Sequence, residues 1–275
     1  MTEADDRAAG LVLEKTRGHS RWRFEADAGL LAAIAACYAS TSDAQRRLFC
    51  AKANDLLVEE HVAARYLERG GSQWVYGELT IDGCLAMLDA LGILSHSRGR
   101  DEAATFLDCG SGVGQVVLCA ALLGCVTRSI GVELVAARHA VAERALSRLL
   151  AALTDSEMVV DGLHSRVELQ CSDILVETDR LSEVSHAFIA NAVWADELTS
   201  EVVTHVMAQA ARIRVIATLK APPAEVLSAT GLTHLRTVPV AVSWERDEGW
   251  PLYVYSSRQD PACCAAAARG RPQDE

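Results

Sequence analysis

Two kinds of apolar segment alternate along the central part of the chain. The short apolar segment Thr105–Cys109 has the length of a buried strand, and Val167–Cys171 is a further predicted strand. Longer runs at Gln115–Leu123 and Leu134–Leu153 have the length of helices, and the second carries Arg and Glu on its outer face. Strands that alternate with helices predict an α/β fold, in which a mainly parallel sheet is covered on both faces.

The alternation continues to residue 257. It adds strands at Ser129–Val132, Ala187–Ala190 and Arg214–Leu219, a helix at Glu197–Gln209 and a short helix from Pro223. Only a loop separates the last two predicted strands, Val238–Trp244 and Leu252–Tyr255. Because antiparallel neighbours need only a short connection, we expect this pair to form an antiparallel hairpin at one edge of the sheet.

The N-terminal region differs from this pattern. An apolar run at Leu30–Tyr38, and a second run that follows the N-cap candidates at 41–43, predict helices. We therefore expect residues 1–75 to form a helical cap and residues 76–257 to form the main domain. Residues 258–275, rich in Ala, Arg and Pro, are expected to be a disordered tail.

Composition and charge limit the class of protein. Half of the 275 residues are hydrophobic and 23% are charged, as in ordinary globular proteins. The formal charge of −11 (26 basic against 37 acidic residues) excludes a domain held on DNA by bulk positive charge. Nine cysteines without a CxxC pair favour a reducing, intracellular compartment, and we expect neither a secretory signal nor a membrane span.

The glycine-rich segment after the first of these strands carries the most chemical information. Phe106-Leu-Asp-Cys-Gly110-Ser-Gly112-Val-Gly114-Gln115 ends a strand, turns at three glycines and starts a helix. A helix N-terminus offers unpaired N–H groups, and glycines let a ligand approach the backbone. A dinucleotide site would have its third glycine where this chain has Gln115. Asp108 instead suits the cationic amino-acid part of S-adenosylmethionine.

Acidic residues also follow the second and third strands. Glu133 comes 23 residues after Gly110, a typical separation for a carboxylate that binds both ribose hydroxyls of an adenosine. Asp173 and Ile174 could hold the adenine amino group and ring face. Because ligands bind at the carboxyl ends of strands, we expect Asp108, Glu133 and Asp173 in one site. The alternative is that all three are ordinary turn residues.

A longer match extends this prediction. The run Phe106–Leu118, which reads FLDCGSGVGQVVL, and the following Gly131-Val-Glu133 resemble the disruptor-of-telomeric-silencing (Dot) methyltransferases. These enzymes methylate a lysine in the globular core of histone three on nucleosomes, and they have a class I, Rossmann-like methyltransferase fold. The resemblance implies a nuclear, S-adenosylmethionine-dependent histone lysine N-methyltransferase with a seven-stranded sheet. Its product would be S-adenosylhomocysteine, and its catalytic domain would span residues 76–257.

Further stretches resemble the same family in the same order. Val75-Tyr76-Gly77-Glu78 resembles the loop over the methionine part of the cofactor, and Asp173-Ile174 resembles the pair at the adenine. Phe188–Trp194, which reads FIANAVW, resembles a segment that usually carries two asparagines and then aromatic residues. Val242-Ser243-Trp244 and Pro251-Leu-Tyr253 resemble the final hairpin that walls the lysine channel.

The resemblance implies two sets of site residues. The expected cofactor-binding residues are Tyr76, Gly77, Glu78, Leu79, Thr80, Asp108, Gly110, Gly112, Gln115, Glu133, Asp173, Ile174 and Asn191. The expected catalytic and channel residues are Phe188, Asn191, Trp194, Trp244 and Tyr253, with no metal. We expect the Asn191 amide to contact the cofactor or the target amine. The alternative for the aromatic residues is a place in the core.

Departures from the family pattern keep other functions open. Leu79 stands where a threonine is usual, with Thr80 one place later, and Ala190 stands where the first asparagine is usual. One alternative is a class I methyltransferase that acts on another protein or a small molecule. The other is an S-adenosylmethionine-binding scaffold that has lost turnover.

The expected partners are the nucleosome and its core histones. The family's basic nucleosome-binding extension is not evident. Weak contact with DNA could come from three arginine clusters, Arg17/Arg21/Arg23, Arg98/Arg100 and Arg269/Arg271. The alternatives are solvated arginines on loops, and an acidic surface that docks on the histones directly.

Overall fold

A seven-stranded mixed sheet forms the centre of the protein. The computed structural model describes residues 11–16, 19–24, 28–39, 77–94, 104–122, 126–155 and 162–257. The sheet has the order β5-β4-β3-β6-β7-β9-β8. Its strands are β3 (Ala104–Cys109), β4 (Val126–Glu133), β5 (Val167–Cys171), β6 (His186–Ile189), β7 (Val215–Thr218), β8 (Thr233–Val242) and β9 (Glu245–Ser256). The strands β3 to β7 are parallel to one another, and β9 is antiparallel to β7 and β8.

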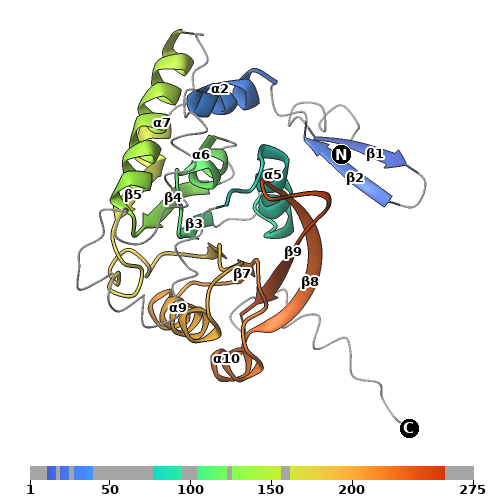
Figure 1. Cartoon of the computed structure of the whole chain (residues 1–275), viewed down its shortest axis with the longest axis vertical. Coiled ribbons are helices and arrows are strands. Elements are labelled where there is room, and N and C mark those ends of the chain that lie inside the picture. The colour runs from blue at the N-terminus through green and yellow to red at the C-terminus, as the bar shows by residue number, and fades with distance from the viewer. Residues whose placement is uncertain are drawn as a thin grey trace.

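Helices cover both faces of this sheet (Figure 1). On one face lie α2 (Ala28–Ala39), α5 (Ile81–Ala90), α6 (Gln115–Leu122), α7 (Ala136–Asp155) and the short α8 (Leu163–Arg166). On the other face lie α9 (Asp196–Gln209) and α10 (Ala224–Thr230). Two separate apolar cores result, because alternate residues of each buried strand point to opposite faces. Phe106 belongs to the first core and Leu107 to the second.

The sheet order locates the crevice where a ligand binds. The strand β3 lies between β4 on one side and β6 on the other, so the chain changes direction across the sheet at β3. In open α/β sheets, the crevice at such a switch point lies outside the carboxyl ends of the strands. The glycine-rich segment after β3 lies there. This order and the two helical layers confirm the predicted class I, Rossmann-like fold.

The structure departs from the helical prediction at the N-terminus. Residues Leu11–Thr16 (β1) and His19–Phe24 (β2) form a two-stranded antiparallel hairpin. Thr16 pairs with His19, so the two strands are only two residues apart in the sequence, a separation that is common in β-hairpins. The apolar run before Tyr38 is helical as predicted, in α2. The second predicted helix and the predicted tail lie outside the described residues.

The last two strands are longer than the sequence predicted. A loop was expected between Trp244 and Pro251, but β9 already begins at Glu245 and the turn is short. Val240 pairs with Trp250, whereas Val242 pairs with Glu245, so β9 contains extra residues as a bulge. A bulge lengthens one strand without ending its pairing, which is why the segment resembled a loop in the sequence.

In the part of the chain that the structure describes, no helix is long and apolar enough to cross a membrane.

Candidate functional site

The glycine loop closes over the end of β4. The backbone N–H groups of Gly110 and Ser111 both donate to the carbonyl of Val132, at 2.9 and 3.1 Å. Gly110 and Gly114 have φ angles of +79° and +82°, which side chains disfavour. A Cβ atom on Gly114 would also lie 2.9 Å from the Cβ of Ala142, so glycine allows the loop to pack against α7.

Glu133 joins this loop to the start of α7. Its Oε2 accepts a hydrogen bond of 2.7 Å from the Gly112 N–H, and its Oε1 accepts one of 2.8 Å from the Val135 N–H. The guanidinium of Arg138, on the first turn of α7, lies 3.8 Å from Oε1. Both charged side chains are about 95% buried. The carboxylate therefore orients the loop, and each oxygen keeps a lone pair for a further donor.

Asp108 is the second buried acid of the site. Its Oδ1 atom has no hydrogen-bond partner among the described residues. Burial, and next the Glu133 carboxylate, raise the pKa of Asp108 from 3.8 to about 8. A buried polar atom is normally paired, and an ionised carboxylate is normally balanced. Asp108 thus has unused capacity to bind a cationic hydrogen-bond donor.

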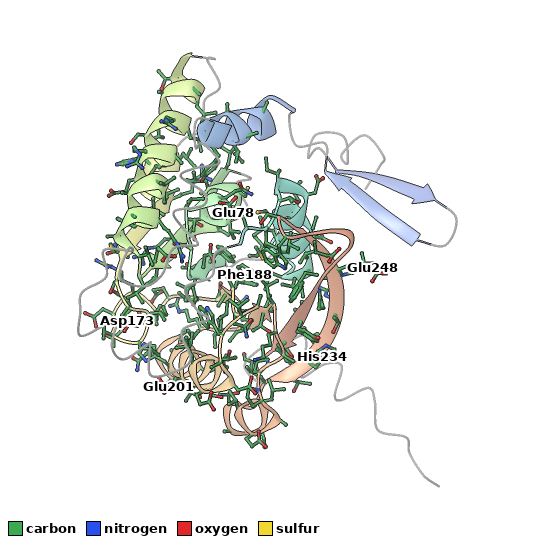
Figure 2. All side chains as sticks on the ribbon, in the orientation of Figure 1. Glu78, Asp173, Phe188, Glu201, His234 and Glu248 are labelled. Atoms are coloured by element: carbon green, nitrogen blue, oxygen red, sulfur yellow. The ribbon has the colours of Figure 1, made fainter. Side chains whose placement is uncertain are left out.

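Two cavities meet next to these acids. The larger, of about 360 Å³, extends from Val132, Glu133 and Ile174 to a cluster of tryptophans. The smaller, of about 40 Å³, is bounded by Glu78, Asp108, the glycine loop and Phe188. Figure 2 shows Phe188 near the centre of the sheet with Glu78 on the α5 side of it. Residues that line both cavities are Gly77, Gly110, Ala190, Leu219 and Trp244.

Three tryptophans, Trp194, Trp244 and Trp250, form one end of the larger cavity, and we call them the tryptophan wall. The rings of Trp244 and Trp250 meet edge to face, with centroids 5.6 Å apart. The indole N–H of Trp250 donates to the Leu219 carbonyl at 2.9 Å, which satisfies its polar group. Trp244 is 41% exposed, so the wall reaches the surface.

The segment 77–80 is fastened to the β8–β9 turn. The N–H of Glu78 donates to the Ser243 hydroxyl, and the Ser243 N–H donates to the Glu78 carbonyl. A Cβ atom on Gly77 would lie 2.3 Å from the Trp244 ring, so only glycine allows this contact. From the other side, the Gln115 amide donates to the Leu79 carbonyl at 2.8 Å. The segment 77–80 therefore contacts both Gln115, which follows the glycine loop, and Trp244 of the tryptophan wall.

Residues 58–246 match the family described as histone methylation protein DOT1. That match covers more than half of the chain, including the glycine loop, Glu133 and Trp244. The chain belongs to the DOT1 histone methylation family. It is therefore a methyltransferase, and the family confirms the predicted cofactor, S-adenosylmethionine. The residues that surround Asp108 fit this cofactor, because an unpartnered buried carboxylate oxygen suits its ammonium group.

Solved structures resemble this DOT1-family chain only distantly. Magnesium protoporphyrin IX methyltransferase from Synechocystis PCC 6803, with bound SAH, is 15% identical with a TM-score of 0.46; the match covers 83% of this chain and 99% of that one. The methyltransferase domain of bacterial CtHen1-C is 13% identical with a TM-score of 0.46, covering 65% and 99%. Ribosomal protein L11 methylase from Lactobacillus delbrueckii subsp. bulgaricus is 13% identical with a TM-score of 0.41, covering 61% and 76%. No curated protein matches the sequence significantly.

Most of the predicted DOT1-type cofactor residues lie at the two cavities. The described ones that line a cavity are Gly77, Glu78, Leu79, Asp108, Gly110, Gly112, Gln115, Glu133 and Ile174. Thr80 and Asp173 do not line either cavity. Thr80 is the N-cap of α5 and accepts from the Gly83 N–H, whereas Asp173 Oδ1 accepts from the Leu175 N–H. Tyr76 lies outside the described residues.

Asn191 is turned away from both cavities. Its Oδ1 accepts hydrogen bonds from the N–H groups of Leu219 (2.9 Å) and Lys220 (3.0 Å), and its Nδ2 donates to the Lys220 carbonyl (2.9 Å). The side chain is fully buried. In this geometry the amide is paired with backbone groups and lines neither cavity, whereas the motif predicted a contact with the cofactor or the target amine. Its neighbour Ala190 faces both cavities instead, because the two residues point in different directions at the end of β6.

In β9, Trp250 lines the larger cavity, whereas the sequence analysis predicted Tyr253 for this position. Tyr253 does not line the cavity; it packs with the core that α9 covers. Trp250, which the sequence analysis did not predict as a site residue, packs with the opposite core beside Leu252 and Val254. Strand residues alternate between faces, so 250, 252 and 254 share one face and 253 the other. This period was readable in the sequence, but the predicted strand began only at Leu252. Phe188, Trp194 and Trp244 line the cavities as expected.

We predict that cofactor affinity depends on the protonation of Asp108. At neutral pH the free protein holds most of this group in the neutral form, and only the ionised form balances an ammonium. Affinity for S-adenosylhomocysteine should therefore rise by about 10-fold per pH unit toward a plateau near pH 8. Calorimetry from pH 6 to pH 9 measures the slope. Asp108→Asn should bind more weakly at pH 8 and lose the slope; an unchanged slope in this variant would assign it to another group.

We predict that Asn191→Ala acts mainly on stability. The substitution leaves two N–H groups and one carbonyl of buried backbone without partners, a cost of about 2–4 kcal/mol in the free energy of unfolding. Urea unfolding of the apo protein measures this loss. Thr199→Val is a matched control, because Thr199 accepts only the weakest Asn191 contact, at 3.4 Å. An Asn191→Ala protein with native stability and no turnover would instead restore a direct catalytic role.

Proposed function

We propose that the protein transfers a methyl group from S-adenosylmethionine to the side-chain amine of a lysine in the globular core of histone three on nucleosomes. The observation that carries this proposal is the junction of the two cavities at Ala190, where a site with buried acids opens onto the tryptophan wall. Membership of a histone methylation family adds the class of substrate.

Each part of the site has a role in this proposal. Asp108 and Glu78 hold the charged amino-acid part of the cofactor at the smaller cavity, and the glycine loop lies along it. Glu133 accepts the ribose hydroxyls, and Ile174 packs on the adenine. Arg138 offsets the negative charge of Glu133, which would otherwise stand next to Asp108 in a buried site.

The chain's own contribution to the chemistry is alignment and desolvation. When bound, S-adenosylmethionine supplies an electrophilic methyl group. The tryptophan wall and Leu219 surround the incoming amine with apolar surface, which disfavours its ammonium form and lowers its pKa. The titratable side chains among the described residues of both cavities, Glu78, Asp108, Glu133 and Arg138, all belong to the cofactor end. The amine therefore loses its proton to solvent before it enters, and alignment provides most of the rate.

The tryptophan wall also suits methylated products. Aromatic faces attract methylated ammonium groups by about 0.5–2 kcal/mol each. Ala190 leaves space at the junction where an asparagine side chain is usual for the family. We infer that the channel accepts an amine that already carries a methyl group, and that methylation can continue beyond the first step.

The place of action in this proposal is chromatin in the nucleus. Net charge of −11 complements basic histones better than DNA. The arginine clusters expected to touch DNA include no side chain that the structure describes, so the proposal relies on contacts with histone surface near the exposed ring of Trp244.

Mass spectrometry of histones tests this function. Recombinant nucleosomes, free histones and small amines are each incubated with the protein and S-adenosylmethionine, and methylated lysines are mapped. Modification of a core lysine of histone three on nucleosomes is the expected result. Methylation of free proteins or small amines alone would indicate another methyltransferase, and cofactor binding without product would indicate a scaffold.

We predict that Trp250, and not Tyr253, contributes to the channel. Trp250→Leu removes one aromatic face from the cavity, so kcat/KM for the lysine substrate should fall about 3- to 30-fold. Affinity for S-adenosylhomocysteine should stay within about 2-fold, because the cofactor end is unchanged. Tyr253→Phe is the control and should retain full activity. A larger loss in Tyr253→Phe than in Trp250→Leu would reverse the assignment.

A further inference from the structure

The helix α2 contacts the cofactor loop although it precedes the family match. The matched region begins at residue 58, whereas α2 spans Ala28–Ala39. Its buried residues Ile34, Cys37 and Tyr38 follow the i, i+3, i+4 spacing of one helix face. This face packs on α6 and α7, next to the glycine loop (Figure 1).

Tyr38 reaches the loop itself. Its hydroxyl donates a hydrogen bond of 3.1 Å to the carbonyl of Val113, between Gly112 and Gly114. Both residues are buried, at 6% and 3% exposure, so water cannot replace the bond. Burial also raises the pKa of Tyr38 well above its usual value, so the phenol keeps the proton that it donates.

The loop is thereby held at three successive residues by three different elements. Glu133 of β4 accepts from the Gly112 N–H, Tyr38 of α2 donates to the Val113 carbonyl, and Ala142 of α7 packs on Gly114. Gly112 and Gly114 both have positive φ here. Because glycine has no Cβ atom, an unrestrained loop at these positions can adopt many other backbone conformations. A loop of this kind binds a ligand tightly only if its binding conformation is populated beforehand.

We infer that Tyr38 is a positioning residue that pre-orders the glycine loop, so that α2 is part of the cofactor site. This inference rests on the proposed placement of S-adenosylmethionine along that loop. Tyr38 touches neither cavity, and its effect passes through the Val113 carbonyl. Loss of the hydroxyl should lower the population of the ordered loop and leave the alignment of bound reactants unchanged.

Tyr38→Phe tests the inference, because it removes one oxygen atom and keeps the ring. We expect Kd for S-adenosylhomocysteine, and KM for S-adenosylmethionine, to rise about 5- to 20-fold, since the loop loses one buried hydrogen bond that holds it in place. We expect kcat at saturating cofactor to change less than about 2-fold. Amide hydrogen exchange at Gly112–Gly114 should accelerate in the apo protein.

Ile34→Val is the matched control. It removes one methylene-sized group from the same buried helix face, and its stability loss is comparable, but an isoleucine side chain has no polar group that could hydrogen-bond the loop. Melting temperatures should fall in both variants, whereas Kd and loop exchange should change only in Tyr38→Phe. Equal Kd values in Tyr38→Phe and wild type would overturn the inference, as would equal increases in both variants. A wild-type protein that binds no S-adenosylhomocysteine would instead overturn the proposed cofactor site.

Discussion

The carboxylate of Glu133 accepts one hydrogen bond from the glycine loop, through Gly112, and another from the start of α7, through Val135. The position of the loop, the first turn of α7 and the charge of Arg138 all depend on this buried group. It also contributes to the raised pKa of Asp108, because two carboxylates in one buried site disfavour a second negative charge. The same buried carboxylate therefore fixes the loop and also makes the position beside Asp108 favourable for a cation.

Around this centre, the loops at the carboxyl ends of the strands are connected to one another by hydrogen bonds to backbone. Gln115 holds the carbonyl of Leu79, Asn191 holds the backbone of Leu219 and Lys220, and Trp250 holds the Leu219 carbonyl. Gln115 and Asn191, which were predicted to bind the cofactor, and Trp250, which was not predicted, thus all hold the walls of the cavities in place. A site of this type gains precision because its walls belong to a rigid network before any ligand binds.

Much of the fold and part of the site could be predicted from the sequence. The strands β3 to β7 and the helices α6, α7 and α9 were predicted to within a few residues, because strand-like and helix-like segments of characteristic length alternate along this part of the chain. The glycine loop, Asp108 and Glu133 were recognised because their chemistry depends on short local spacing. The N-terminal hairpin was missed, since its pairing depends on a two-residue connection and not on periodicity.

The sequence by itself determined the α/β architecture, the cofactor class and the family, because these depend on patterns within a few tens of residues. Only the tertiary structure decided which side chains reach the cavities. The extension of β9 through residue 250 made Trp250 and not Tyr253 part of the wall, and the turn after β6 pointed Asn191 into the backbone of Leu219 and left Ala190 at the junction. The contact between Tyr38 and Val113 joins residues 75 positions apart. Strand boundaries, turn geometry and such distant contacts are set by packing, so local spacing does not specify them.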